Sequence, residues 1–358
     1  MLNFRRLLNF GALISFLILA AVLPAFPQAT VEQCTSIYQV LTSNQNSAEL
    51  VKVEQALSSG KEYLEKCKNL SAEGSDRIVT YITNQIPKLE RSVDTLRIER
   101  SFNNALAQRN RDELISTAKK LLERNRPYSL DLVLDIVSIG FDSASLSVPN
   151  DKYNDDAITF ANLALKKLEA GENSGNKDKF GFYVAYKTDK CADGRANAIG
   201  WMHYTIGFIK FTRKKDPKDA LPYLYRASQN GCETKTFSEN YRLIGSWYID
   251  ESNLIGEQRK QLLTAAENKE TPETASLFEL QMAYIDRAID AYARAYRQAS
   301  ISPKAVQAYK DALLNKLKEL FAVRYEGDTS KMDAYVSKVS DTPFPDPSTP
   351  VAPPKTTP

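Results

Sequence analysis

The sequence contains a single histidine among its 358 residues, and this scarcity narrows the chemistry open to the chain. One imidazole, His203, excludes a metal site built on two histidines of the same chain. It stands among apolar positions of a helical stretch, so we interpret it as a packing residue. No Cys-x-x-Cys pair is present for zinc and no Gly-x-Ser-x-Gly turn for a serine nucleophile. We therefore expect no cofactor, no metal and no enzymatic activity.

Long apolar runs are missing everywhere except at the N-terminus. Two arginines precede a mostly apolar stretch over residues 7–23, and small and polar residues follow it up to Ala29. This order predicts a secretory signal peptide over residues 1–29, with the remainder periplasmic or secreted. An uncleaved N-terminal anchor is the open alternative, because a spanning helix needs roughly 17–25 residues. Contact with a membrane is expected only in that case.

A strong excess of either charge is also missing. Without the two arginines of the signal segment, 45 basic and 44 acidic residues remain. This balance argues against nucleic acid as a partner. The apolar content of 43% and the charged content of 25% are those of an ordinary soluble globular protein.

The cysteines are few but all lie after the signal segment. They are Cys34, Cys67, Cys191 and Cys232. An even number in an exported chain indicates disulfides, although four cysteines allow three pairings. Hairpin geometry favours Cys191 with Cys232, because an antiparallel return brings both members of a pair to one end. It favours Cys34 with Cys67 in the same way, although the two arms of that hairpin are less equal in length.

Apolar residues recur at spacings of three and four along most of the chain, which predicts an all-α protein of stacked antiparallel helical hairpins. Pro87 should kink or divide one helix, and residues 171–194 are predicted to be an irregular insert with a short strand pair. The expected helices are 31–43, 48–67, 75–109, 111–124, 129–143, 153–169, 195–213, 216–230, 236–250, 256–268, 274–300, 303–325 and 329–339. The expected divisions after the signal are N-terminal hairpins over 30–127, helical repeats and long C-terminal helices over 128–341, and a disordered Pro-rich tail over 342–358.

Three Ile-Gly strings stand inside amphipathic runs, and Ala-rich runs follow the first two. The strings are Ile139-Gly140, Ile206-Gly207 and Ile244-Gly245. The alanine pairs, each seven residues apart on one helix face, are Ala157/Ala164 and Ala220/Ala227. Small residues let a neighbouring helix come close, so we expect these positions to interlock successive helices.

At residues 128–250 this pattern resembles tetratricopeptide-type helix–turn–helix repeats. The family's Leu-Gly pair corresponds to Ile206-Gly207 and to Ile244-Gly245, and Tyr248 stands at its aromatic spacing. The repeat-ending proline is absent, with Cys232 near its place, and Tyr241 replaces the first-helix tryptophan. Gly140 and Gly207 are 67 residues apart and Gly207 and Gly245 are 38 apart, whereas the family's repeat length is about 34 residues. The chain also resembles exported repeat proteins of environmental bacteria, a similarity that implies no activity.

The resemblance implies binding rather than catalysis, since such repeats mostly serve as protein-binding scaffolds. We therefore expect an exported scaffold that binds an unknown protein or peptide, with a structural role at the cell envelope as the alternative. The first helices of stacked hairpins line a concave surface. Polar and aromatic residues that could hold a peptide there are Asn197, Tyr204, Tyr241 and Arg242. Plain solvent exposure of these four residues is the competing interpretation.

Overall fold

The computed structural model describes residues 29–70, 74–124, 129–174, 188, 191–230 and 232–352. These residues are helical, and their only β pairing is an isolated bridge between Thr188 and Cys191, so the all-α prediction is confirmed for this part of the chain. The predicted signal peptide and most of the predicted 171–194 insert lie outside the described residues.

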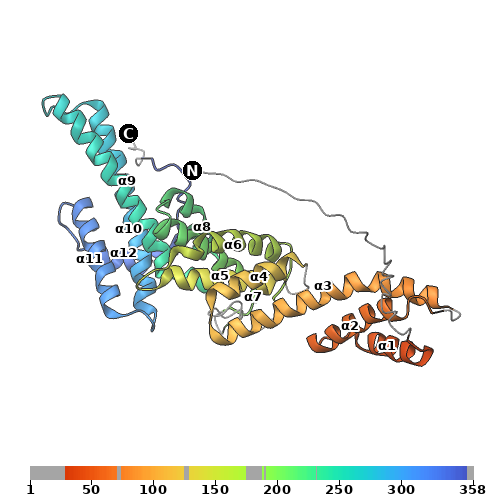
Figure 1. Ribbon diagram of the computed structural model, residues 1–358. Helices are drawn as coiled ribbons and strands as arrows, with labels where there is room; N and C mark the ends of the chain where they lie inside the picture. Colours follow the sequence, from red (N-terminus) through yellow and green to blue (C-terminus); the bar gives the residue numbers. More distant parts are fainter. Residues whose placement is uncertain are drawn as a thin grey trace, which may run out of the picture. The chain divides into compact units, whose positions relative to one another are not determined.

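Twelve α-helices occur in the described part of the chain (Figure 1). They are α1 (Val31–Asn44), α2 (Leu50–Lys66), α3 (Ser75–Gln108), α4 (Arg111–Glu123), α5 (Ser129–Ser145), α6 (Asn154–Glu169), α7 (Gly194–Phe208), α8 (Pro217–Gln229), α9 (Ser238–Ala265), α10 (Pro272–Ile301), α11 (Gln307–Arg324) and α12 (Met332–Lys338). Short 3-10 turns precede α6 and α9 and follow α12, and one π-helical turn over Ile209–Arg213 extends α7.

The chain forms two compact units, Met1–Arg100 and Ser101–Pro358. The division falls inside α3, and α4 packs on α5 within the second unit.

In the first unit, α1 and α2 form an antiparallel hairpin that packs on the first part of α3. Thr30 and Gln33 exchange hydrogen bonds in a capping box that starts α1. Pro87 lies inside α3 and does not divide it, so the alternative of two separate helices is wrong. The neighbouring residues Leu89 and Val93 are buried against α2, and this packing offsets the hydrogen bond that proline removes.

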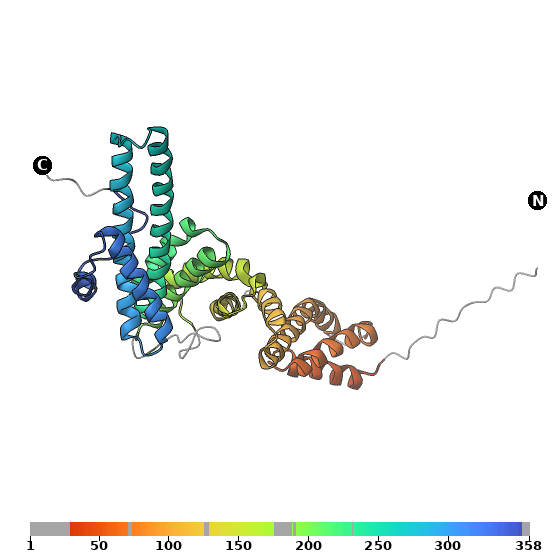
Figure 2. The same ribbon diagram turned by 90° about the vertical axis from the view of Figure 1, so that its left-hand side faces the viewer.

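In the second unit, consecutive helices pack against each other from α4 to α11. Asp216 caps α8 through the N–H of Asp219, and Pro217 occupies the first turn, as the sequence predicts. The two helices predicted at 236–250 and 256–268 are instead one helix, α9. It pairs with α10 along its length (Figure 2), and nothing in the intervening sequence stops a helix.

The glycines of the three Ile-Gly strings all stand at close helix contacts. A Cβ added to Gly140 would lie 2.4 Å from the Cβ of Ala157, so α5 and α6 interlock as expected. Gly207 instead faces Leu224 of α8, and Gly245 faces Tyr292 of α10. The predicted glycine–alanine pairing is therefore confirmed in the first hairpin only, although the close approach occurs in all three.

The Pro-rich tail is not wholly disordered, and this prediction is wrong for residues 342–352. Phe344 is only 5% exposed and joins the core cluster of the second unit, with Val351 packed against the same cluster. Burial of the Phe344 side chain docks this segment, although the average composition of the segment is that of a linker. Residues 353–358 lie outside the described residues.

Candidate functional site

The predicted groove residues do not form an open groove. Asn197, Tyr204 and Tyr241 are 0%, 6% and 5% exposed. The Asn197 amide lies 3.3 Å from the carboxylate of Glu233, and the ring of Tyr204 packs edge-on against Phe141 at 5.7 Å. All three residues are therefore part of the packed interior, and Tyr241 also contacts Phe344 of the tail.

Arg242 is half-buried and paired. Its guanidinium donates to both carboxylate oxygens of Glu239, at 2.7 and 2.6 Å, and this pairing raises the pKa of Arg242. The hydroxyl of Tyr309 donates to the same carboxylate at 3.0 Å. Two nitrogen atoms of Arg242, Nε and Nη2, are therefore engaged by Glu239 of the same helix.

The two cysteine pairs favoured by hairpin geometry are the two disulfides of the structure. Cys34 and Cys67 join the start of α1 to the end of α2, with Cα atoms 5.9 Å apart. Cys191 and Cys232 close the α7–α8 hairpin, with Cα atoms 5.1 Å apart. Two disulfides suggest an oxidising, extracytoplasmic environment.

His203 lies on α7, facing α8, and is 6% exposed. Its Nδ1 has no hydrogen-bond partner among the described residues. Burial, assisted by the nearby Arg226, lowers the pKa of His203 to about 4. A neutral, buried imidazole without an acidic partner fits the predicted packing role better than that of a general base.

The most specific arrangement in the described residues surrounds the ring of Phe344, which three consecutive helices hold. We call Tyr225 of α8, Tyr241 of α9 and Arg294 of α10 the Phe344 site. The ring centroid of Phe344 lies 6.1 Å from that of Tyr225 and 5.1 Å from that of Tyr241, in an edge-on arrangement with the latter. The Arg294 guanidinium carbon lies 5.3 Å from the same centroid, within the range of a cation–π contact.

Two side chains of the Phe344 site, those of Arg294 and Tyr241, also make hydrogen bonds that do not involve the tail. Arg294 is 7% exposed and donates through Nε to the Asp290 carboxylate at 2.7 Å, one helical turn away. The Tyr241 hydroxyl donates to the Lys235 carbonyl at 2.9 Å, and burial raises the pKa of Tyr241 to about 12. These bonds orient a cation and an aromatic ring from two helices toward one point.

In the recorded hydrogen bonds between the Phe344 site and the tail backbone, the tail contributes carbonyl oxygens as acceptors. Arg294 Nη2 donates to the Thr342 carbonyl at 2.9 Å, and the Tyr225 hydroxyl donates to the Phe344 carbonyl at 3.5 Å. Pro343 and Pro345, which flank the aromatic residue, carry no N–H. Figure 1 shows the dark-blue tail passing α8 after it leaves α12.

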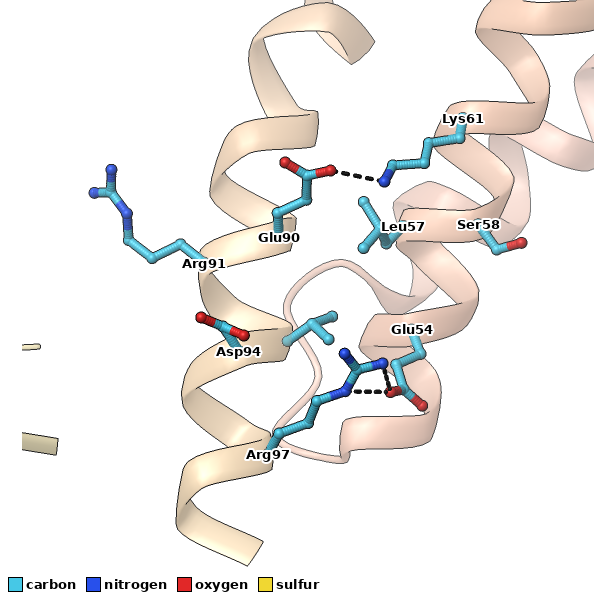
Figure 3. Close-up of a pocket in the computed structure, with 9 residues that line it drawn as sticks. Glu54, Leu57, Ser58, Lys61, Glu90, Arg91, Asp94 and Arg97 are labelled. Carbon is cyan, nitrogen blue, oxygen red and sulfur yellow. Dashed lines mark hydrogen bonds and ion pairs between the residues drawn. The ribbon is translucent and has the colours of Figure 1, made fainter. Parts of the chain in front are cut away.

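A second concave surface lies in the first unit between α2 and α3, and charged residues line it (Figure 3). Lys61 pairs with Glu90 at 2.7 Å, and Arg97 pairs with Glu54 at 2.7 Å. Exposed pairs of this kind contribute little to stability. Because the cations and carboxylates neutralise each other across the groove, nothing in it selects a charged ligand.

In the described part of the chain, no group of three or more His, Cys, Asp or Glu side chains could hold a metal ion. Likewise, none of the helices described is both long and apolar enough to cross a bilayer.

Sequence reasoning missed Tyr225, Arg294 and Phe344. The sequence does contain features that mark Phe344 and Arg294. Phe344 is the only aromatic residue after Thr342, and it stands between two prolines. Arg294 is the one charged residue in a run that is otherwise Ala and Tyr, residues 291–296.

Comparisons of the chain with protein families, with curated proteins and with solved structures gave no match. Any functional argument therefore depends on the geometry of the chain itself.

Proposed function

We propose that this chain is an exported, tetratricopeptide-like helical-repeat scaffold that binds an extended peptide segment of another protein outside the cytoplasm. The binding surface in this proposal is the Phe344 site on α8, α9 and α10. Stacking of the hairpins into a solenoid belongs to the same proposal.

Three features support the proposal. The glycines of α5, α7 and α9 stand at close helix contacts of the kind that stacked hairpins use. The two disulfides agree with an oxidising compartment. Arg294 and Tyr241 are held by their own hydrogen bonds, so a ligand would not have to order them.

The observation that carries the proposal is that the surface already holds an extended segment. Residues 343–346 have no regular secondary structure, yet Phe344 is as buried as a core residue. A single aromatic anchor with a few backbone hydrogen bonds is how peptide-binding surfaces hold their ligands. The tail is thus treated as an intramolecular example of the ligand.

The proposal can be tested with the full-length chain carrying Phe344→Ala, which keeps the tail but removes its anchor. A synthetic peptide of residues 340–352 is titrated into this variant by calorimetry. We expect saturable binding with a Kd of about 1 mM or tighter, which corresponds to about 4 kcal/mol. That amount is consistent with one buried phenylalanine plus a hydrogen bond from a charged donor.

A matched control carries Tyr225→Ala in addition to Phe344→Ala. Tyr225 is half-buried, so its loss should remove one wall of the site without unfolding the helices. Binding that is unchanged in this control would place the peptide elsewhere. No binding to the single variant would favour the alternative of a structural envelope protein, in which the tail is simply part of the fold.

A further inference from the structure

We infer that the segment this scaffold takes from its partner is proline-rich, with one aromatic residue flanked by prolines, and that the chain's own tail competes for the same site. This inference rests on the proposed function and names the chemistry of its ligand.

The anchor must be aromatic. Tyr225 and Tyr241 present ring surfaces to Phe344 at centroid distances of 6.1 and 5.1 Å, and Arg294 adds a cation at 5.3 Å. An aliphatic side chain could fill part of the volume, but it would lose the edge-on ring contacts and the cation–π attraction. The site therefore prefers phenylalanine or a similar ring.

The backbone of the ligand is recognised through its acceptors. In the bonds recorded at the site, the protein supplies N–H and O–H donors and the tail supplies the carbonyls of Thr342 and Phe344. A segment with proline on both sides of the anchor offers carbonyls while removing the N–H groups that would otherwise need acceptors. Proline also fixes φ and lowers the entropy lost on binding, which is why aromatic surfaces often bind proline-rich segments.

The tail competes because it is tethered beside the site. Thr342 follows directly on the turn that ends at Asp341, so the anchor of the tail is always close to Arg294. A ligand that binds only the open site has an apparent Kd raised by the reciprocal of the open fraction. Since the tail makes the same contacts, we expect the wild-type chain to bind the peptide at least about fivefold more weakly than Phe344→Ala does.

The decisive experiment is a peptide series titrated into full-length Phe344→Ala. The reference peptide has the native 340–352 sequence, the second has the phenylalanine replaced by alanine, and the third has both flanking prolines replaced by alanine. We expect the second to bind about 30-fold more weakly, as loss of a buried aromatic ring requires. The third should bind about fivefold more weakly, from the greater freedom of its unbound backbone.

The outcomes separate the inference from the proposed function. If the third peptide binds as well as the reference, the proline-rich ligand is excluded while peptide binding stands. If wild type and Phe344→Ala bind the reference equally, competition by the tail is excluded. If no peptide binds, the proposed function itself fails. Concentration-dependent dimers of wild type, absent in Phe344→Ala, would instead assign the site to the tail of a second copy and overturn the inference.

Discussion

Replacing Gly140 by alanine tests the close contact between α5 and α6 directly. The added Cβ would lie 2.4 Å from the Cβ of Ala157 and 3.1 Å from the carbonyl oxygen of Tyr153. Carbon atoms pack at about 3.5–4.0 Å, so the two helices would have to separate by about 1 Å. Overpacking of this kind costs about 1–3 kcal/mol. Alanine returns up to about 1 kcal/mol of helix propensity, so an overpacking cost in the upper half of that range leaves a net loss of about 1–2 kcal/mol.

Gly256→Ala is the matched control, because it is the same substitution in another helix of the same unit. There the added Cβ would meet the amide nitrogen of Gln281 at 2.6 Å, at the end of a flexible side chain that can move. This variant should gain up to about 1 kcal/mol from helix propensity alone. The two variants should therefore change stability in opposite directions.

Thermal unfolding followed by circular dichroism measures both effects. For a unit of this size about 1 kcal/mol corresponds to 2–4 °C, so Gly140→Ala should melt about 2–8 °C below wild type and Gly256→Ala slightly above it. A Gly140→Ala variant as stable as wild type would refute the interlocked packing of α5 and α6. Equal losses in both variants would show that glycine is needed for helix flexibility and not for close approach.

Three further predictions concern the tail, a disulfide and the histidine. Phe344→Ala should lower the melting temperature by a few degrees, because detachment of the tail limits the loss to its docking free energy of about 1–3 kcal/mol; an unchanged midpoint would mean that the tail does not dock in solution. Replacing Cys191 and Cys232 together by serine should cost about 4 kcal/mol, the loop-closure value for a sequence separation of 41 residues, and should leave the helix content in circular dichroism intact; a stability equal to that of wild type would exclude this pairing. Because the pKa of His203 is lowered to about 4 in the folded chain, the unfolded chain binds more protons between pH 6.5 and 4, and denaturant titrations should show a loss of about 3 kcal/mol as the pH falls through that window. His203→Leu should remove this part of the pH dependence, and an unaltered dependence would assign it to other groups.

Local patterns predicted the helices well because their causes are local. Asp216 and Pro217 start α8 through capping and a fixed φ, which depend only on neighbouring residues. The continuity of α9 was not predicted because the polar residues before Gly256 interrupt the apolar pattern, whereas the helix continues through them alongside α10. Pro87 is a similar case, since burial of the surrounding apolar stripe outweighs the missing hydrogen bond.

The site was harder to predict because its residues are far apart in the sequence and no motif or unusual residue type marks them. Asn197 and Tyr204 were expected not to pack inward, yet the Asn197 amide nitrogen donates to Glu233 and the Tyr204 ring packs among other aromatic rings inside the fold. Tyr241 was among the predicted groove residues, but its contact with Phe344, which lies 103 positions later in the printed sequence, was not predicted. Nothing in a window of helical length links the two residues.

The separation between Tyr225 and Phe344, 119 residues along the chain, also bears on when the fold is completed. The helix contacts join neighbours in sequence, and contacts of this kind form early because little chain entropy is lost in closing short loops. The tail can dock only after α8, α9 and α10 have come together and residue 344 has been synthesised. Docking of the tail is therefore the last step in completing the core of the second unit, because Phe344 can join that core only after its helices are in place.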